Sequence, residues 1–224
     1  MPRPSIASTP RSDGGLRVGF VAGVTPDRWA RVWAERRPRQ PLRLVPLGEQ
    51  PDPVALLRAH ELRMCFLRLP DHAERDTTGL HLIVLYDEQP VVVVAREHPV
   101  AAYDEIDVAD LADEHLLQHP DAVPAWRDVA TELADGSRHP VPDLTLREAM
   151  ESVAADAGIL VLPLAVARLH HRRDVRHVPV TGVPATSVGL AWLRDPGSGA
   201  DADQEGVDTF IGVVRGRTAN SSRG

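Results

Sequence analysis

Short apolar, β-branched runs alternate along this chain with stretches of helical periodicity, and this alternation constrains the fold more than any other feature. The run at 16–21 precedes Thr25-Pro26-Asp27, where a capping hydroxyl, a proline and an acid predict the start of a helix. A second strand, helix and strand follow in the same order, at residues 42–47, 53–57 and 64–69, and Asp52-Pro53 predicts the start of this second helix. Repeats of this kind pack as a mostly parallel sheet, so we predict an α/β protein.

The second half of the chain continues the alternation with shorter elements. Strands are predicted at 80–85 and 90–95. The four consecutive valines of the strand at 90–95 indicate burial on both faces, and we predict that this strand ends the first half of the chain. Thr145 and Glu148 are spaced as a capping box, which predicts a helix start. The remaining elements are helices at 107–112, 124–134 and 163–171, strands at 159–162, 175–180 and 187–193, and a last helix at 207–214.

Length, charge and composition exclude several classes of protein. A chain of 224 residues can bury a core without metals or disulfides, and its one cysteine, Cys65, lies in an apolar run where a thiol packs well. A net charge of -7 argues against a general coat for nucleic acid, and no apolar run reaches the length of a membrane span. Residues 1–15 predict a disordered tail without a signal peptide, which indicates a cytoplasmic protein, and residues 215–224 predict a basic disordered tail.

Motifs of catalysis and metal binding are missing from the sequence. It contains no G-x-S-x-G, phosphate loop, G-x-G-x-x-G or C-x-x-C. His170 and His171 are adjacent, and neighbouring side chains on a helix point about 100° apart, so we expect no shared metal. We therefore predict no enzyme activity, no cofactor and no metal site.

Three loops after predicted strands are the candidate ligand site, because α/β sheets bind ligands at the carboxyl ends of their strands. They are Val24-Thr25, Gly48-Glu49-Gln50 and Arg68-Leu69-Pro70. A helix start, a hydroxyl and an arginine together suit a small carboxylate. Each residue also has a plainer interpretation: Thr25 as a helix cap and Arg68 as half of a surface ion pair.

Four segments of the sequence carry a family resemblance through their order and spacing. They are LRVGFV at 16–21, the stretch from VALLR at 54 to FLRLP ending at 70, EHPVA at 97–101, and VAADAGILVLP at 153–163. Together they resemble the effector-binding domain of LysR-type transcriptional regulators, from Leu16 to about Arg215. EHPVA matches the family's HPLA turn, and the last segment matches its V-x-x-G-x-G-I stretch.

The resemblance implies a type II periplasmic-binding-protein-like fold, in which two α/β subdomains are joined by two crossovers. Subdomain 1 would comprise 16–96 and 182–214, and subdomain 2 would comprise 97–181, with crossovers near 95–98 and 181–187. An effector would bind in the cleft between them. The residues implied to line that cleft are Val24, Thr25, Glu49, Gln50, Arg68 and Leu69 from subdomain 1, and Trp126, Leu144 and Thr145 from subdomain 2.

The resemblance also implies a homodimer, in which the helix that carries Trp29 and Trp33 would meet its partner. Family members normally carry a winged helix-turn-helix before the first strand, and only fifteen residues stand there in this sequence. We therefore expect the protein to reach DNA through a partner regulator. Asp156 replaces a family glycine, and Arg63 stands where an aspartate is usual.

The leading hypothesis is a protein that senses a small molecule and modulates transcription. The effector could be a carboxylate, but Glu49 beside the site would favour a cationic, zwitterionic or neutral ligand. An enzyme in the same cleft would have only Glu49 and Thr25 as base or nucleophile. A ligand-independent interaction module, with the basic tail touching DNA, and an exported solute-binding protein are the remaining alternatives.

Overall fold

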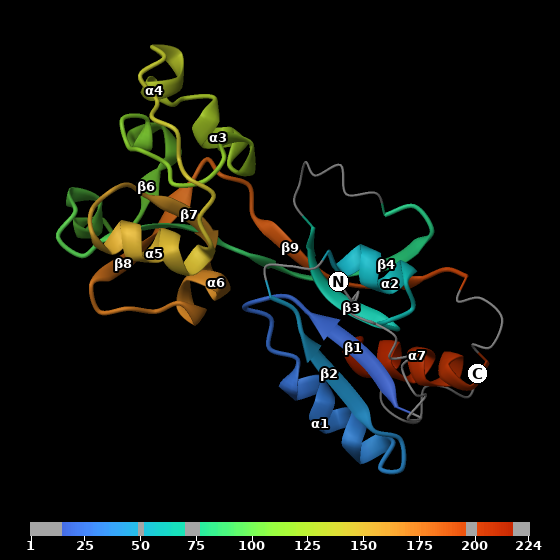
Figure 1. Cartoon of the computed structure of the whole chain (residues 1–224). Helices are drawn as coiled ribbons and strands as arrows, with labels where there is room; N and C mark the ends of the chain where they lie inside the picture. The colour runs from blue at the N-terminus through green and yellow to red at the C-terminus, as the bar shows by residue number, and fades with distance from the viewer. Residues whose placement is uncertain (1–14, 49–51, 70–76, 196–200, 217–224) are drawn as a thin grey trace, which may run out of the picture.

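The chain forms two mixed α/β subdomains in the computed structural model, which describes residues 15–48, 52–69, 77–195 and 201–216 (Figure 1). Subdomain 1 consists of β1 (Leu16–Phe20), α1 (Asp27–Arg36), β2 (Leu42–Pro46), α2 (Pro53–Arg58), β3 (Met64–Leu69), β4 (Leu80–Glu88), β9 (Thr186–Leu193) and α7 (Asp201–Val214). Subdomain 2 consists of β5 (Pro90–Ala95), β6 (Ile106–Asp107), α3 (Pro124–Arg127), α4 (Thr131–Ala134), α5 (Leu146–Ala154), β7 (Leu160–Pro163), α6 (Leu164–Leu169) and β8 (Val175–Thr181), with single-turn 3-10 helices at 99–102, 108–111 and 120–122.

The sheet of subdomain 1 has the strand order β2-β1-β3-β9-β4. β1 pairs in parallel with β2 and β3, as the strand–helix–strand repeats predict. β9 returns from subdomain 2 and inserts antiparallel between β3 and β4. The last strand and helix therefore complete the first subdomain, and α7 contacts α1 and β1.

The valine run β5 belongs to the second sheet, whose order is β6-β8-β5-β7. Our prediction that it closes the first half is therefore wrong, and the first crossover lies at Gln89 instead of near 95–98. The physical reason is that β5 is central in its own sheet: Val91 and Val93 pack in the core that includes α5 and α6, while Val92 and Val94 pack in the core on the other face. The chain passes back between Thr181 and Thr186.

The tryptophans of α1 lie inside the core of subdomain 1. Trp29 stacks on Phe66 with ring centroids 4.7 Å apart, and Trp33 meets Phe210 of α7 edge-on at 5.8 Å. The Trp33 indole N–H also donates to the Gln40 carbonyl at 2.8 Å. These side chains cannot form the interface of a dimer, because α7 and the sheet already cover them.

Helices begin as predicted after Thr25-Pro26, after Asp52 and after Thr145, and the predicted cap residue is confirmed at the last two sites. Asp52 accepts a hydrogen bond from the Val54 N–H at 3.1 Å, and Thr145 and Glu148 form the complete capping box. The predicted helix at 124–134 is instead two short helices, because the backbone at Ala130 is extended with ψ of 120°. Within the described ranges, no helix has both the length and the apolar character to cross a membrane.

Candidate functional site

The loop after β1 forms part of the cavity wall between the two subdomains. Its backbone turns at Gly23, with φ of +82°, and Val24 donates its N–H to the Val21 carbonyl at 3.2 Å. Val24 is buried, whereas Thr25 is exposed. The predicted capping role of Thr25 is wrong, because Pro26 is the N-cap residue of α1 and no side chain caps this helix. Thr25 is therefore an exposed residue that caps no helix.

Arg68, near the end of β3, forms a buried ion pair. Its Nε donates to Glu88 Oε2 at 2.6 Å, and its Nη1 donates to the Ala22 carbonyl at 2.5 Å. Only 17% of the Arg68 side chain and 5% of the Glu88 side chain are exposed. Of the two interpretations left open by the sequence, ion pairing is the one observed, but in the interior and not on the surface. The pair ties β3, the end of β4 and the β1–α1 loop together.

Two polar atoms of this ion pair have no hydrogen-bond partner among the described residues. They are Arg68 Nη2 and Glu88 Oε1, and both are buried. Nearby, burial raises the pKa of the Tyr86 hydroxyl, and the negative charge of Glu88 raises it further. The positive charge of Arg68 is thus largely balanced by Glu88, so little of it remains to attract an anionic ligand.

A cavity of about 980 Å³ lies between the subdomains. The β1–α1 loop and the end of β4 line it from subdomain 1, and α6 lines it from subdomain 2. The two walls approach closely at Gly23, where a Cβ atom, if this residue had one, would lie 3.0 Å from the Ala165 carbonyl carbon of α6. Figure 1 shows α6 on the side of subdomain 2 that faces subdomain 1.

Carboxylates outnumber cations in the lining of this cavity. Asp27 and Asp87 contribute negative charge, Arg168 of α6 contributes positive charge, and the charge of Glu88 is balanced by Arg68. Asp87 accepts a hydrogen bond from the Ser187 hydroxyl at 2.6 Å. Apolar side chains make up much of the remaining wall. Such a site suits a ligand with an apolar body and hydrogen-bond donors better than a lone carboxylate.

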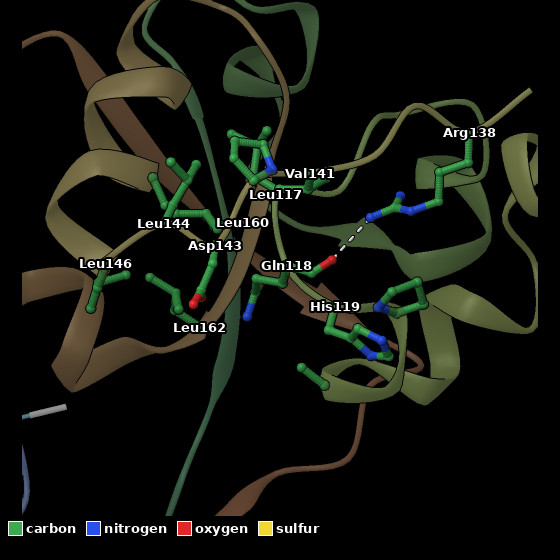
Figure 2. A pocket seen from close by; sticks show the side chains of 14 residues that line it. Leu117, Gln118, His119, Arg138, Val141, Asp143, Leu144, Leu146, Leu160 and Leu162 are labelled. Carbon is green, nitrogen blue, oxygen red and sulfur yellow. Dashed lines mark hydrogen bonds between the residues drawn. The ribbon is translucent and has the colours of Figure 1, made fainter. Parts of the chain in front are cut away.

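A second cavity, of about 680 Å³, lies within subdomain 2. Figure 2 shows Leu144, Leu146 and Leu162 on one side of it and His119 and Arg138 on the other. This pocket combines an apolar wall from α5 and β7 with polar groups from the segment 117–122 and from the loop before α5.

Arg138 and Gln118 fix the polar side of the second cavity. Arg138 Nη2 donates to the carbonyls of Leu116 at 2.8 Å and Gln118 at 3.0 Å, and its Nη1 is paired with Glu132. The Gln118 side-chain oxygen accepts the Val161 N–H at 2.7 Å, so its amide NH₂ group remains as a donor at the pocket.

Comparison with known families decides the identity of the domain. Residues 11–213 match the model of the family described as "LysR substrate binding domain". The chain belongs to the LysR substrate-binding domain family. A curated relative, the "Probable hydrogen peroxide-inducible genes activator" of Mycobacterium avium, is 25% identical over 218 residues, which are 94% of this chain and 68% of that protein.

Solved LysR-type domains share the fold. The reduced form of the OxyR regulatory domain from Pseudomonas aeruginosa superposes with a TM-score of 0.61 at 21% identity, covering 90% of this chain and 94% of that one. The effector-binding domain of a BenM variant superposes with a TM-score of 0.61 at 19% identity, covering 92% of this chain and 98% of that one. These likenesses confirm the predicted fold class, a type II periplasmic-binding-protein-like fold with two α/β subdomains.

The sequence-predicted site residues of this LysR domain are distributed over several environments. Val24 and Thr25 line the cavity between the subdomains, and Leu144 lines the second cavity. Leu69 is half-buried beside the ion pair at the end of β3, and Glu49 and Gln50 lie outside the described residues.

Two of the predicted residues from subdomain 2 have structural roles. Trp126 is fully buried, and its indole N–H donates to the Leu111 carbonyl at 3.0 Å, so it is a core residue and cannot contact a ligand in the cleft. The Thr145 hydroxyl is held by Glu148 at 2.7 Å within the capping box. The burial of Trp126 corrects the prediction that it contacts a ligand. The ligand contact of Thr145 stays a prediction, and this residue lines neither of the two cavities.

Sequence reasoning does not identify the end of β4 and helix α6 as parts of the site. Tyr86, Asp87 and Glu88 line the inter-subdomain cavity together with Arg168. A signal is present in the sequence, because the polar triplet at 87–89 separates two apolar runs and so marks a strand end. Sequence reasoning assigns the strands at 80–85 and 90–95 to the same half of the chain. It therefore does not predict the crossover between them, where these side chains lie.

Proposed function

We propose that this LysR domain binds a small molecule between its subdomains, in the cytoplasm, and that binding modulates transcription through a partner regulator. The observation that supports this most is the cavity of about 980 Å³ lined by both subdomains. A ligand that contacts both walls stabilises one relative arrangement of the subdomains. A partner that contacts both subdomains would respond to this change of arrangement.

The charges around the cavity favour an effector with hydrogen-bond donors, such as an amine, an alcohol or an amide. Glu88 holds the charge of Arg68, and Asp27 and Asp87 face the same space as Arg168. A carboxylate effector would need Arg168 as its main cation. The charge excess therefore supports the cationic, zwitterionic and neutral alternatives over the carboxylate.

A binding role is proposed in preference to catalysis and to a disulfide switch. In the described part of the chain, the Thr25 hydroxyl makes no hydrogen bond to a base that could activate it. Some similar OxyR structures are named as oxidized and reduced forms. Here the one cysteine of the 224 residues, Cys65, is fully buried in β3, so this sequence offers no second thiol for an internal disulfide.

Thermal-shift screening of wild-type protein and Thr25→Val against amines, amino acids, amides, alcohols and carboxylates tests the proposal. A ligand at 100 times its Kd increases the free energy of unfolding by about 2.7 kcal/mol, which raises the melting temperature by several degrees. Thr25 is exposed and caps no helix, so its replacement should leave the unliganded melting temperature unchanged while reducing the shift.

Thr77→Val is the matched control for this screen. Thr77 is also exposed, but it lies before the start of β4, at the opposite end of the strand from the cavity. A ligand whose shift falls in Thr25→Val and not in Thr77→Val supports binding between the subdomains. Equal shifts in all three proteins, or no shift with any compound, would refute it.

We also propose a homodimer in which the α1 tryptophans take no part. Sedimentation velocity at micromolar concentration tests this, and a monomer at that concentration would count against it.

A further inference from the structure

The connection from α6 to β8 carries concentrated positive charge on an acidic chain. Residues 168–177 contain four arginines and three histidines against one aspartate, whereas the whole chain has a net charge of -7. Arg168, His171, Arg173 and Arg176 are exposed. We call the basic side chains of this segment the α6–β8 basic surface; they are Arg168, His170, His171, Arg172, Arg173, Arg176 and His177.

Several of these charges converge in space around His177 of β8. The pKa of this imidazole is lowered by its burial and then by the positive charges of Arg168, His171 and Arg176. Arg168 belongs to α6 and Arg176 to β8, so two elements bring their cations to one place. Arg168 and Arg176 therefore form one cluster of like charges beside His177.

The end of β5 adds a further cation to the surface. Arg96 Nη1 donates to the Arg173 carbonyl at 3.2 Å, which holds one guanidinium beside the backbone that carries the other. Arg172 is neutralised by Asp174 through contacts of 2.9 and 2.7 Å, and this lowers the pKa of Asp174 to about 2.

The other arginines of the surface lack such compensation. Within the described residues, Arg168, Arg173 and Arg176 form no ion pair. The carboxylates of Glu97 and Asp156 line a hollow with Arg173 but are not paired with it. Uncompensated like charges repel one another, and a bound polyanion relieves that repulsion.

We propose that the α6–β8 basic surface binds the phosphate backbone of duplex DNA. Guanidinium groups bind phosphate oxygens through two parallel hydrogen bonds, and such contacts need no particular base sequence. The surface is local, which is compatible with the acidity of the rest of the chain. A LysR domain acts in transcription, so duplex DNA is the polyanion within reach. Leu169, which is 59% exposed among these charges, makes an acidic protein segment the competing partner.

Fluorescence anisotropy with a labelled duplex of arbitrary sequence tests the proposal on the full chain. The variant Arg173→Gln with Arg176→Gln removes two exposed charges that line neither the ligand cavity nor the core. We expect this variant to bind the duplex at least tenfold more weakly at about 50 mM salt. The plot of log association constant against log salt concentration should become less steep by about 2.

Two further variants control for charge and folding. Arg31→Gln with Arg39→Gln removes two exposed charges from subdomain 1 and should bind like wild type. Arg173→Lys with Arg176→Lys keeps the charge and should bind within a few-fold of wild type. The sequence after Arg215 is the same in the wild type and in all variants, so any contribution it makes to DNA binding is the same in each protein.

The outcomes separate the two partners. Weaker duplex binding in the first variant alone supports the DNA surface. Equal weakening in the Arg31 and Arg39 control shows a general charge effect and overturns it. If the wild type does not bind the duplex, the proposal is also overturned. If it then binds labelled poly-glutamate, the surface is assigned to an acidic protein partner.

Discussion

Arg68 holds the buried carboxylate of Glu88, and removing one member of a buried ion pair leaves the other charge uncompensated. We expect Arg68→Ala to lower the free energy of unfolding by about 3 kcal/mol, measured by urea unfolding. Arg147→Ala is the control, because it breaks an exposed pair with Glu151 and should change stability by less than about 0.5 kcal/mol. A loss in Arg68→Ala no greater than in the control would mean that solvent screens the pair.

The sequence could identify Arg68 as a residue of interest but not its partner. Glu88 lies 20 residues further along, on a strand that is separated from β3 by β9. The contact depends on the order of strands in the sheet, which no local pattern encodes. The same limit applies to Trp126, whose apolar character fits a core residue and a ligand contact equally well.

Asp156 shows how an element can tolerate an unfavourable residue. It follows the C-cap of α5 with φ of +59°, where glycine is favoured because it has no side chain to clash. We expect Asp156→Gly to stabilise the protein by about 0.5 kcal/mol, since relief of backbone strain exceeds the added entropy of the unfolded chain. Ala155→Gly, at φ of -86°, should instead destabilise it. Thermal unfolding of both variants would measure this, and the reverse order would contradict it.

Element boundaries follow from the sequence where a cap marks them. Asp52 and Thr145 are identified by their spacing, because capping depends on neighbouring residues alone. The valine run of β5 is correctly predicted to be buried on both faces, yet the prediction places it in the wrong sheet. Burial is a property of the strand, whereas its pairing partners are β7 and β8, which are more than 60 residues away in the sequence.

At the scale of the whole molecule, the order of segments identified the family, and the family fixed the two-subdomain architecture. The chemistry of the cavity could not be obtained in that way. It depends on side chains from the β1–α1 loop, the end of β4 and α6 that meet only when both subdomains are in place. The residue types in the three loops suggested a carboxylate through Arg68, and the ion pair with Glu88 removes most of the basis for that suggestion.

Gly23 is a point at which the two subdomains approach closely in the cavity wall. A side-chain carbon there would lie 2.9 Å from Arg68 Nη2 and 3.0 Å from the Ala165 carbonyl carbon. We expect Gly23→Ala to force the β1–α1 loop away from α6, and small-angle X-ray scattering should show a larger radius of gyration than in wild type. Gly79→Ala is the matched control, because its φ of +79° imposes similar backbone strain with nothing within 4 Å. Both variants should lose about 1 kcal/mol of stability or more, but only Gly23→Ala should expand. Equal radii for the two would show that the subdomains are not held together at this contact.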